Sequence, residues 1–515
     1  MNLTPYQNEP YLDYTAPDNK EKMRQALEKV RNQLGQTYPL WIDGKELRSD
    51  KVEQSVNPAR HKEVIGYVSQ ADASAVEKAI QAASSAFETW RHTSFEERAL
   101  YLVKAAAIMR RRKQELCAWQ ILESGKNWAE ADADVAEAID FLEFYARQAV
   151  RLGKGQKLHP YPGEDNRLEY LPLGVGIVIP PWNFPLAILA GMTTSAIVTG
   201  NTVLLKPAPQ SSVMAAKFIE ILQEIHLPQG VVNFVPGPPE EIGDLMVGHR
   251  DTRFISFTGS KATGLHIDEL AHRKLDGQRW LKRVIAEMGG KDGIVVDETA
   301  DLDAAAEGIV KSAFGFQGQK CSAGSRAIIH EKIYDELVKK VLEETKALKM
   351  GAPADNYPVG PVIDRKAFDK VTGYIEIGNQ ENTLLLGGHA DDSEGYYIQP
   401  TIFGDCTRES QIMKEEIFGP VLSLCKVSSF EEGIDVYNDT EYGLTGGVFS
   451  RDRSRLEYAR KHMMCGNLYL NRKCTGALVG VQPFGGFNMS GTDSKAGGED
   501  YLLNFVQAKV VTEAF

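Results

Sequence analysis

The chain has 515 residues, too many for one ordinary hydrophobic core, so we expect two or three domains. Hydrophobic residues make up 43% and charged residues 25%, as in soluble globular proteins, and the net charge of −12 argues against nucleic acid as a partner. No run of about 18 apolar residues predicts a membrane span, and the N-terminus lacks the layout of a signal peptide, so we expect no membrane contact and a cytoplasmic location.

The cysteine spacing indicates neither disulfide bonds nor a metal site. Six cysteines occur and none forms a Cys-x-x-Cys pair, so we expect reduced thiols rather than a disulfide framework. No His-Glu-x-x-His or comparable ligand cluster is present, and we therefore expect no metal site.

The first 150 residues are predicted to be mainly helical. Apolar residues recur at three- and four-residue spacing over 71–90, 94–112 and 117–151, which predicts three helices. Short strands are expected on either side of Asp43 and Gly44 and over 63–67.

From Leu173 onward, short β-branched runs alternate with helical stretches. The expected strands of a first series are 176–180, 202–206, 231–235, 254–257 and 284–287, with helices at 185–198, 212–226, 240–247 and 261–271. The strands of a second series are 293–296, 326–330, 399–402, 421–426, 445–450 and 467–470, with helices at 302–316, 333–348, 366–379, 430–438 and 453–461. This alternation predicts parallel sheets covered on both faces. The tail ends in a strand-like segment, 505–512, which must pair somewhere, and another subunit is one solution.

Cys321 is the most informative residue. It follows an apolar, helix-like run and has Lys320 beside it and glycines nearby, a setting that lowers a thiol's pKa and favours the nucleophilic thiolate. Upstream, Glu287 ends an apolar strand and precedes two glycines. A nucleophilic thiol with a positioned carboxylate indicates acyl chemistry through a thioester, although an inert buried thiol and a surface glutamate fit the residues equally well.

A phosphate site is the second candidate feature. Residues 174–179 lack the third glycine of the Gly-x-Gly-x-x-Gly fingerprint. Residues 257–264 are a better candidate, because a strand is followed by Gly259 and by Ser260, which can cap the next helix, and helix N-termini favour pyrophosphate. An ordinary capped helix explains the same pattern. Lys206 ends a predicted strand, where ligands of open α/β sheets bind, but solvated lysines are common there too.

Seven ordered segments, spread between Trp41 and the C-terminus, resemble motifs of the aldehyde dehydrogenase superfamily. They are PWNFP at 181–185, KPA at 206–208, FTGS at 257–260, EMGG at 287–290, GQKC at 318–321, EEIFGP at 415–420 and PFGG at 483–486. The resemblance implies an α/β fold with two doubly wound parallel-sheet domains and a small β oligomerisation element. Further similarity, at 125–127, 131–141 and 474–477, is to the branch that oxidises L-glutamate γ-semialdehyde, the open form of 1-pyrroline-5-carboxylate, to L-glutamate in proline and arginine breakdown.

The resemblance also implies catalytic roles. Cys321 would attack the aldehyde carbon to give a thiohemiacetal, and Asn183 with the backbone N–H of Cys321 would form the oxyanion hole. Transfer of a hydride to the nicotinamide would leave a thioester. Glu287 would be the general base for the water that hydrolyses it.

The resemblance implies a cofactor-binding set as well: Trp182, Lys206, Gly259, Ser260, Glu416 and Phe418. Ser260 and the helix after it would meet the pyrophosphate, Lys206 the adenosine ribose and Glu416 the nicotinamide ribose, while Phe418 would pack on the nicotinamide. The family often has a glutamate that binds the ribose 2′-hydroxyl three residues after the lysine, but this chain has Pro209. We therefore expect NAD as the main cofactor, with measurable use of NADP.

The implied substrate-binding set is Glu137, Phe184, Ser322, Gly476, Ala477 and Phe484. The backbone N–H groups of Gly476 and Ala477 and the hydroxyl of Ser322 would hold the substrate carboxylate, and Glu137 would face the ammonium. Phe184 and Phe484 would line the methylene chain. A solvated helix face is the alternative interpretation of Glu137.

Three alternative functions differ in what they require of Glu137, Glu287 and Cys321. A related dehydrogenase for succinate semialdehyde or another ω-carboxylated aldehyde would not need Glu137. A CoA-acylating enzyme is disfavoured, because Glu287 supplies a base that water needs and a CoA thiol does not. An inactive structural or binding homologue is expected to have lost the nucleophile or the base, and both are present.

The predicted organisation has three parts. Residues 1–154 and 174–286 would form a dinucleotide-binding domain, and residues 287–490 a catalytic domain. A hairpin at 155–173 and the tail at 491–515 would form an oligomerisation element, so we expect at least a homodimer. The expected partners are a small-molecule substrate and other copies of the chain, with no nucleic acid and no membrane.

Overall fold

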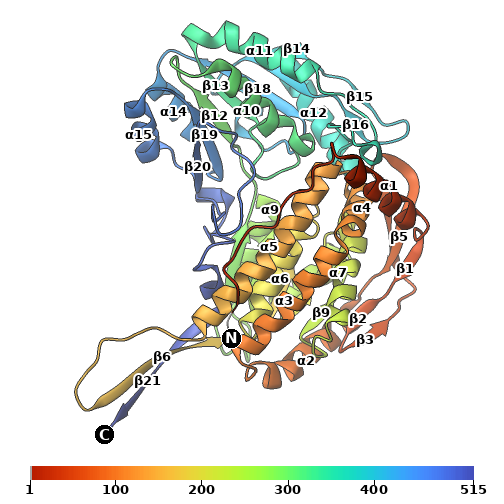
Figure 1. The fold of residues 1–515 in the computed structure, drawn as a ribbon, viewed down its shortest axis with the longest axis vertical. Helices are drawn as coiled ribbons and strands as arrows, with labels where there is room; N and C mark the ends of the chain where they lie inside the picture. The colour runs from red at the N-terminus through yellow and green to blue at the C-terminus, as the bar shows by residue number, and fades with distance from the viewer. Residues whose placement is uncertain (1–2) are drawn as a thin grey trace.

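The computed structural model describes residues 3–515, and within them two seven-stranded sheets form two lobes (Figure 1). The first sheet has the order β11 (Arg283–Glu287), β10 (Thr252–Thr258), β7 (Val175–Ile179), β8 (Thr202–Leu205), β9 (Val232–Phe234), β2 (Leu40–Ile42) and β3 (Lys45–Leu47). The second has the order β14 (Thr383–Leu386), β17 (Thr401–Cys406), β18 (Val421–Val427), β13 (Arg326–His330), β12 (Gly293–Val296), β19 (Thr445–Phe449) and β20 (Asn467–Leu470).

The first sheet has a topological switch point between β7 and β10. Strands β7, β8 and β9 follow one another in one direction, whereas β10 and β11 lie on the other side of β7, and all five are parallel. The connections after β7 and β10 therefore run to opposite faces of the sheet, which opens a crevice at their carboxyl ends. The predicted parallel sheet is confirmed, and antiparallel β2 and β3 extend its edge.

Helices cover both faces of the first sheet. Ile177 and Leu204 point into a core with α2 (Ala73–Trp90), α8 (Asp244–Gly248) and α9 (Lys261–Ala271). Their neighbours Val178 and Leu205 point into the opposite core. The helices of that second core are α1 (Pro17–Arg31), α3 (Phe95–Arg111), α4 (Lys113–Ser124), α5 (Trp128–Leu152), α6 (Ala187–Val198) and α7 (Ser212–Glu224). Alternate side chains on a strand face opposite sides, so an apolar strand is buried on both.

The second sheet is built in the same way. Val295 and Ile328 pack on one face, and Val296 and Ile329 on the other. The covering helices are α12 (Arg365–Glu381), α13 (Gln411–Lys414), α14 (Phe430–Asn438) and α15 (Arg453–His462) on the first face and α10 (Leu302–Phe314) and α11 (Tyr334–Lys346) on the second. The remaining strands form small sheets: β1 (Gln36–Tyr38), β5 (Arg60–Ser69) and β4 (Val52–Asn57) in one, β15 (Ala390–Asp391) and β16 (Tyr397–Ile398) in another.

The prediction of one helix over 117–151 is wrong. Gly125 adopts φ 70° and ends α4, and the side chain of Asn127 then caps α5 by accepting a hydrogen bond from the backbone N–H of Glu130. Glycine takes this left-handed conformation without the steric penalty that other residues carry. The helix predicted to end at Phe316 also stops early, at Phe314, because Phe316 and Gln317 have positive φ values of 50° and 55°. Helix α1 was not predicted.

The C-terminal strand β21 (Val506–Ala514) pairs antiparallel with β6 (Glu164–Pro172) along its whole length. The resulting two-stranded ribbon projects from the first lobe, with the C-terminus near its tip (Figure 1). The predicted tail strand therefore pairs within its own chain, and the predicted hairpin at 155–173 is mainly a strand of this ribbon, with only an isolated bridge between Gln156 and Leu168. Its predicted oligomerisation role stays a prediction.

Two further properties concern the described part of the chain. Its helices are all too short or too polar to cross a membrane. The six cysteines carry free thiols, and five of them are buried.

Candidate active site

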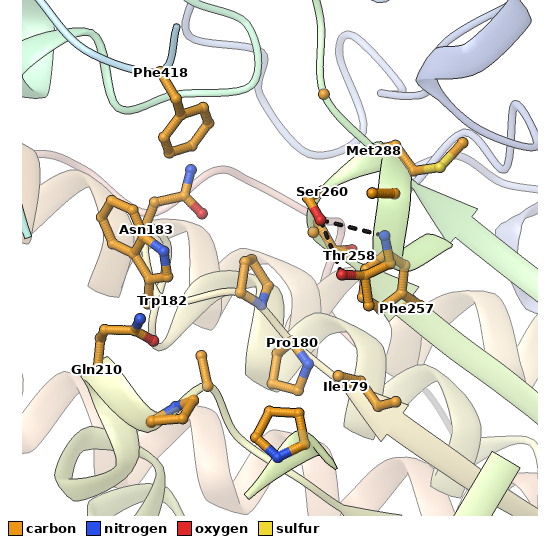
Figure 2. Close-up of a pocket in the computed structure, with 18 of the residues that line it drawn as sticks. Ile179, Pro180, Trp182, Asn183, Gln210, Phe257, Thr258, Ser260, Met288 and Phe418 are labelled. Carbon is orange, nitrogen blue, oxygen red and sulfur yellow. Dashed lines mark hydrogen bonds between the residues drawn. The ribbon is translucent and has the colours of Figure 1, made fainter. Parts of the chain in front are cut away.

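A cavity of about 1020 Å³ lies at the carboxyl edge of the first sheet. Its walls come from the segments that follow β7, β8, β10 and β11, and from the second lobe through Cys321, the start of α12 and Phe418. Figure 2 shows Trp182, Asn183 and Phe418 on one side and Ser260 and Met288 on the other. Its volume matches the upper end of the usual range for ligand and cofactor sites, about 300–1,000 Å³.

The six residues predicted to bind the cofactor all line this cavity: Trp182, Lys206, Gly259, Ser260, Glu416 and Phe418. Segments separated by more than 200 positions in the sequence therefore contribute to one wall. This shared location is what a common ligand requires.

Ser260 caps the helix that points its N-terminus at the cavity. Its hydroxyl accepts a hydrogen bond of 3.4 Å from the backbone N–H of Thr263 and lies 2.9 Å from the Thr263 hydroxyl (Figure 2). Ala262 and Thr263 of the first turn of α9 also line the cavity. The partial positive charge of a helix N-terminus fits a pyrophosphate at this point.

Lys206 is a buried cation in the cavity wall. Its side chain is 3% exposed, and its nearest acceptor is the carbonyl of Pro207 at a long 3.5 Å. Burial lowers the pKa of Lys206 to about 8. An ammonium in this state lacks strong acceptors, so hydroxyl groups of a ribose would satisfy it.

Glu416 and Phe418 form the opposite part of the wall. One carboxylate oxygen of Glu416 accepts a hydrogen bond of 3.1 Å from the backbone N–H of Gly290, and burial raises the pKa of Glu416. A Cβ on Gly289 would lie 2.3 Å from this carboxylate, so the close approach needs glycine. The rings of Phe418 and Trp182 meet edge to face at 5.7 Å.

Cys321 lines the cavity, but its expected electrostatic setting is wrong. The ammonium of Lys320 turns away and pairs with Glu130 at 2.7 Å. Burial, with the carboxylates of Asp292 and Glu416 next, raises the pKa of the Cys321 thiol. The residue type beside the cysteine does not decide its ionisation, because Lys320 is paired with Glu130 while burial and the carboxyl groups of Asp292 and Glu416 act on the thiol.

Asn183 connects the two lobes at the cysteine. Its side-chain nitrogen donates a hydrogen bond of 3.0 Å to the carbonyl of Gln319, two residues before Cys321, and Asn183 is only 4% exposed. An amide carries two N–H donors, so one stays available in the cavity.

Glu287 ends β11 and is held from the segment after the second sheet. One oxygen, Oε1, accepts hydrogen bonds from the backbone N–H and the hydroxyl of Ser494, at 3.2 and 2.6 Å. The other, Oε2, is buried without a donor among residues 3–515. Burial raises the pKa of Glu287 to about 7, so both its protonated and ionised forms are accessible near neutrality.

Comparison with known proteins places this architecture. The family model of the aldehyde dehydrogenase family matches residues 41–511. The chain belongs to the aldehyde dehydrogenase family. Two curated relatives named 1-pyrroline-5-carboxylate dehydrogenase are similar over their full lengths. The one from Geobacillus sp. (strain WCH70) is 56% identical over 514 residues, with 100% of each chain covered. The one from Bacillus subtilis (strain 168) is 55% identical over 511 residues, with 99% of each covered.

The fold agrees with that of a solved structure. The 1-pyrroline-5-carboxylate dehydrogenase from Thermus with bound NAD superposes with a TM-score of 0.99 and is 50% identical, with 100% of both chains covered. The predicted family and the predicted two-sheet α/β fold are thus confirmed.

In this aldehyde dehydrogenase, Glu137 lies on α5 and is not on a solvated helix face, so that alternative is wrong. Its neighbours Ala136 and Ala138 are completely buried, and Glu137 itself is half-buried. Burial, reinforced by the carboxylate of Asp134, raises the pKa of Glu137 to about 8. A carboxyl group in this state is poised to ionise when a cation binds beside it.

None of the six predicted substrate residues, Glu137 included, lines the cavity described above, and contacts join some of them in smaller groups. The thiol of Cys474 donates to the carbonyl of Ser322 at 3.5 Å, which brings the segment with Gly476 and Ala477 to the loop that carries Cys321. Phe484 forms an antiparallel bridge with Ala496. Their roles stay predictions.

Sequence reasoning missed two residues of this region. Lys126 is completely buried, with its ammonium 4.4 Å from the centre of the Phe184 ring and 4.2 Å from that of Phe316. A lysine in the break between two apolar helices was the available signal. Ser494 was the second, and nothing in its local sequence distinguishes it from a loop serine.

Proposed function

We propose that the chain oxidises L-glutamate γ-semialdehyde, the open form of 1-pyrroline-5-carboxylate, to L-glutamate with NAD. The family membership and the full-length similarity to proteins named 1-pyrroline-5-carboxylate dehydrogenase support this reaction. The observation that carries it is the meeting of Cys321 and Asn183 in the wall of one cavity, with the cofactor-binding set around them.

In the first half of the reaction, the sulfur of Cys321 adds to the aldehyde carbon, and the thiol proton passes to solvent water as the carbon–sulfur bond forms. The carbonyl oxygen becomes an oxyanion. The free N–H of Asn183 and the backbone N–H of Cys321 would donate to it, and donors fixed before the reaction stabilise such charge strongly. Bound nicotinamide supplies the acceptor for the hydrogen and two electrons that leave the tetrahedral carbon.

In the second half, water attacks the thioester on Cys321. Glu287 would take the proton of that water through Oε2, the carboxylate oxygen without a donor. The carbon–sulfur bond then breaks, and the departing sulfur takes the proton held by Glu287. Glutamate is released, Cys321 is again a thiol and Glu287 is again a carboxylate.

The cavity residues fit a dinucleotide. The N-terminus of α9 would bind the pyrophosphate, the ammonium of Lys206 the adenosine ribose and Glu416 the nicotinamide ribose. Pro209 begins a short 3₁₀ turn and stands where the family often has a glutamate. The chain therefore has no carboxylate at this position to repel the 2′-phosphate of NADP. We therefore expect measurable turnover with NADP, and an NADP rate of zero would contradict this point.

The substrate's own charges would be recognised next to Cys321. The N–H groups of Gly476 and Ala477 and the Ser322 hydroxyl would hold its carboxylate, while Glu137 would face its ammonium. Phe184 and Phe484 would flank the methylene groups between them.

Assembly and location are also proposed. Val510 and Phe515 on the β6–β21 ribbon are 60% and 88% exposed, and exposed apolar strand surface of this kind is usually covered by another chain. We propose a homo-oligomer that is at least a dimer, active in the cytoplasm. Light scattering of the purified chain measures its oligomeric state, and a monomer at micromolar concentration would refute the proposed homo-oligomer. Cell fractionation tests the proposed location.

The decisive experiment is reduction of NAD in the presence of 1-pyrroline-5-carboxylate, compared with succinate semialdehyde. We expect a higher kcat/KM for the first. A preference for succinate semialdehyde would assign the chain to another ω-carboxylated aldehyde. Labelling of Cys321 by iodoacetamide, slowed by NAD, would show that the nucleophile lies in the cofactor cavity.

A further inference from the structure

Ser494 contacts the carboxylate of Glu287 with two donors at once. Its hydroxyl lies 2.6 Å and its backbone nitrogen 3.2 Å from the same oxygen, Oε1. Ser494 is itself only 8% exposed, so this contact is shielded from bulk water. Hydrogen bonds to an ionised group in such surroundings are stronger than those between neutral groups.

The turn that carries Ser494 is unusual in its backbone. The residues on either side, Asp493 and Lys495, have positive φ values of 51° and 54°. Non-glycine residues in this region are strained and persist only where surrounding contacts hold them, which is common at functional sites.

Contacts on both sides of the turn hold it against the strand that ends in Glu287. The backbone N–H of Thr492 donates to the carbonyl of Ala286, and the Thr492 hydroxyl accepts from the Ala286 N–H at 3.1 Å. On the other side, the ammonium of Lys495 donates to the carbonyls of Gly466 and Gly485 at 2.8 and 2.9 Å. The serine is therefore built into a fixed position relative to Glu287.

We propose that Ser494 is a positioning residue for the general base: it ties Oε1 of Glu287 and thereby leaves Oε2 as the oxygen that accepts the proton of the hydrolytic water. This inference rests on the proposed function, because it takes Glu287 as the base. Oε2 is the oxygen that lacks a donor, so the structure divides the two oxygens into one that Ser494 holds and one without a hydrogen-bond partner among residues 3–515.

Other titratable groups also face Glu287. Lys495 favours the ionised carboxylate, but Asp493 pairs with it at 2.9 Å and offsets its charge. Cys321 approaches from the second lobe and Tyr501 from the C-terminal segment, and burial raises the pKa of both groups, which keeps them neutral near pH 7. Ser494 is the residue that contacts the carboxylate directly with its side chain.

The test compares Ser494→Ala with Ser494→Thr and with Thr492→Val in the full-length enzyme. Ser494→Ala removes the hydroxyl donor and keeps the backbone donor. Ser494→Thr keeps both. Thr492→Val is the matched control, because it removes a hydroxyl from the same turn, keeps the backbone hydrogen bond from Thr492 to Ala286 that holds the turn, and does not touch Glu287.

With 1-pyrroline-5-carboxylate and NAD, the acid limb of the kcat profile should move up by about one pH unit in Ser494→Ala, since a lost donor destabilises the ionised carboxylate. Thioester hydrolysis should slow about 5-fold at pH 7, because the ionised fraction of Glu287 falls from about one half to about one eleventh. A burst of NADH close to one per active site should then appear, as the acylated enzyme accumulates. Ser494→Thr should restore the wild-type midpoint, and Thr492→Val should retain it.

A second substrate separates this inference from the proposed function. p-Nitrophenyl acetate can acylate Cys321 without an aldehyde or NAD, releasing p-nitrophenolate, and water must then hydrolyse the acetyl thioester. Slower deacylation in Ser494→Ala supports the role of Ser494 even if 1-pyrroline-5-carboxylate is not the substrate. The positioning role of Ser494 would be overturned if Ser494→Ala left both the pH midpoint of kcat and the deacylation rate unchanged. It would also be overturned if Thr492→Val shifted the pH midpoint as far as Ser494→Ala does.

Discussion

The side-chain nitrogen of Asn183 donates a 3.0 Å hydrogen bond to the carbonyl of Gln319. Asn183 follows β7 of the first sheet, and Gln319 precedes Cys321 in the second lobe. One bond therefore fixes the proposed oxyanion donor and the nucleophile relative to each other across two separately built sheets.

Replacement of Asn183 by alanine should lower kcat by about 10²- to 10³-fold, the usual effect of losing one oxyanion donor. Steady-state NADH formation measures it. The rate of Cys321 alkylation by iodoacetamide should change much less, because alkylation develops no oxyanion. A kcat within twofold of wild type would remove Asn183 from the oxyanion hole.

Replacement of Cys321 by serine should abolish carboxylate formation. A neutral serine hydroxyl is a much weaker nucleophile, and no base is positioned on it by the structure. Mass spectrometry of wild-type enzyme quenched during turnover should find the acyl adduct on Cys321. Turnover of the serine variant at the wild-type rate, or an adduct on another residue, would contradict the mechanism.

The pH dependence should report Glu287. Burial raises its pKa to about 7, and a base must be ionised to accept a proton, so hydrolysis should fail as pH falls through 7 and level off above it. Where hydrolysis limits turnover, a profile of kcat against pH between about 5.5 and 9 should rise on its acid side with a midpoint near pH 7. This rise is the acid limb of the profile. Glu287→Gln should lose the limb and accumulate the acyl-enzyme. A limb that persists in that variant would belong to another group.

Replacement of Glu137 by glutamine should raise KM for the amino-acid aldehyde and leave KM for simple aldehydes nearly unchanged. Burial raises the pKa of Glu137 to about 8, and a substrate ammonium would favour its ionised form. Competition between glutamate γ-semialdehyde and propanal measures the difference. Equal effects on both substrates would refute the ammonium role.

Replacement of Lys126 by methionine should destabilise the fold by about 3–5 kcal/mol, because it leaves a buried carboxylate without its cation. The ammonium lies 3.6 Å from Asp134, and neither side chain is exposed. Denaturant unfolding measures the change. Replacement of the exposed Lys22 by methionine is the control and should leave the free energy of unfolding nearly unchanged. If Lys126→Met also left it nearly unchanged, the buried pair would contribute no stability.

Local sequence patterns were sufficient for the framework of the first lobe. The predicted strands at 202–206 and 254–257 correspond to β8 and β10, because a buried parallel strand is a short apolar run whatever its partners are. Patterns failed where a single residue changes the backbone. Gly125 interrupts an otherwise continuous helical pattern, and its left-handed conformation cannot be read from periodicity.

The cofactor set could be predicted from motifs, and four of its six residues (Trp182, Lys206, Gly259 and Ser260) follow strands whose positions are fixed by the first sheet. Lys206 and Ser260 meet in one cavity for this reason. Ser494 could not be predicted, since it contacts Glu287 from 207 positions away and acts through a turn that has no motif of its own.

The amino-acid sequence by itself determined the alternation of strands and helices, because this depends on residue types at short spacing, and its ordered motifs determined the family. The nucleophile Cys321 and the base Glu287 were predicted from the same motifs. Only the tertiary structure decided the state of those groups. Lys320 pairs with Glu130 and leaves Cys321 among carboxylates, and Glu287 receives its hydrogen bonds from Ser494. Ionisation depends on burial and on charges brought near by folding, and neither is a property of neighbours in the chain.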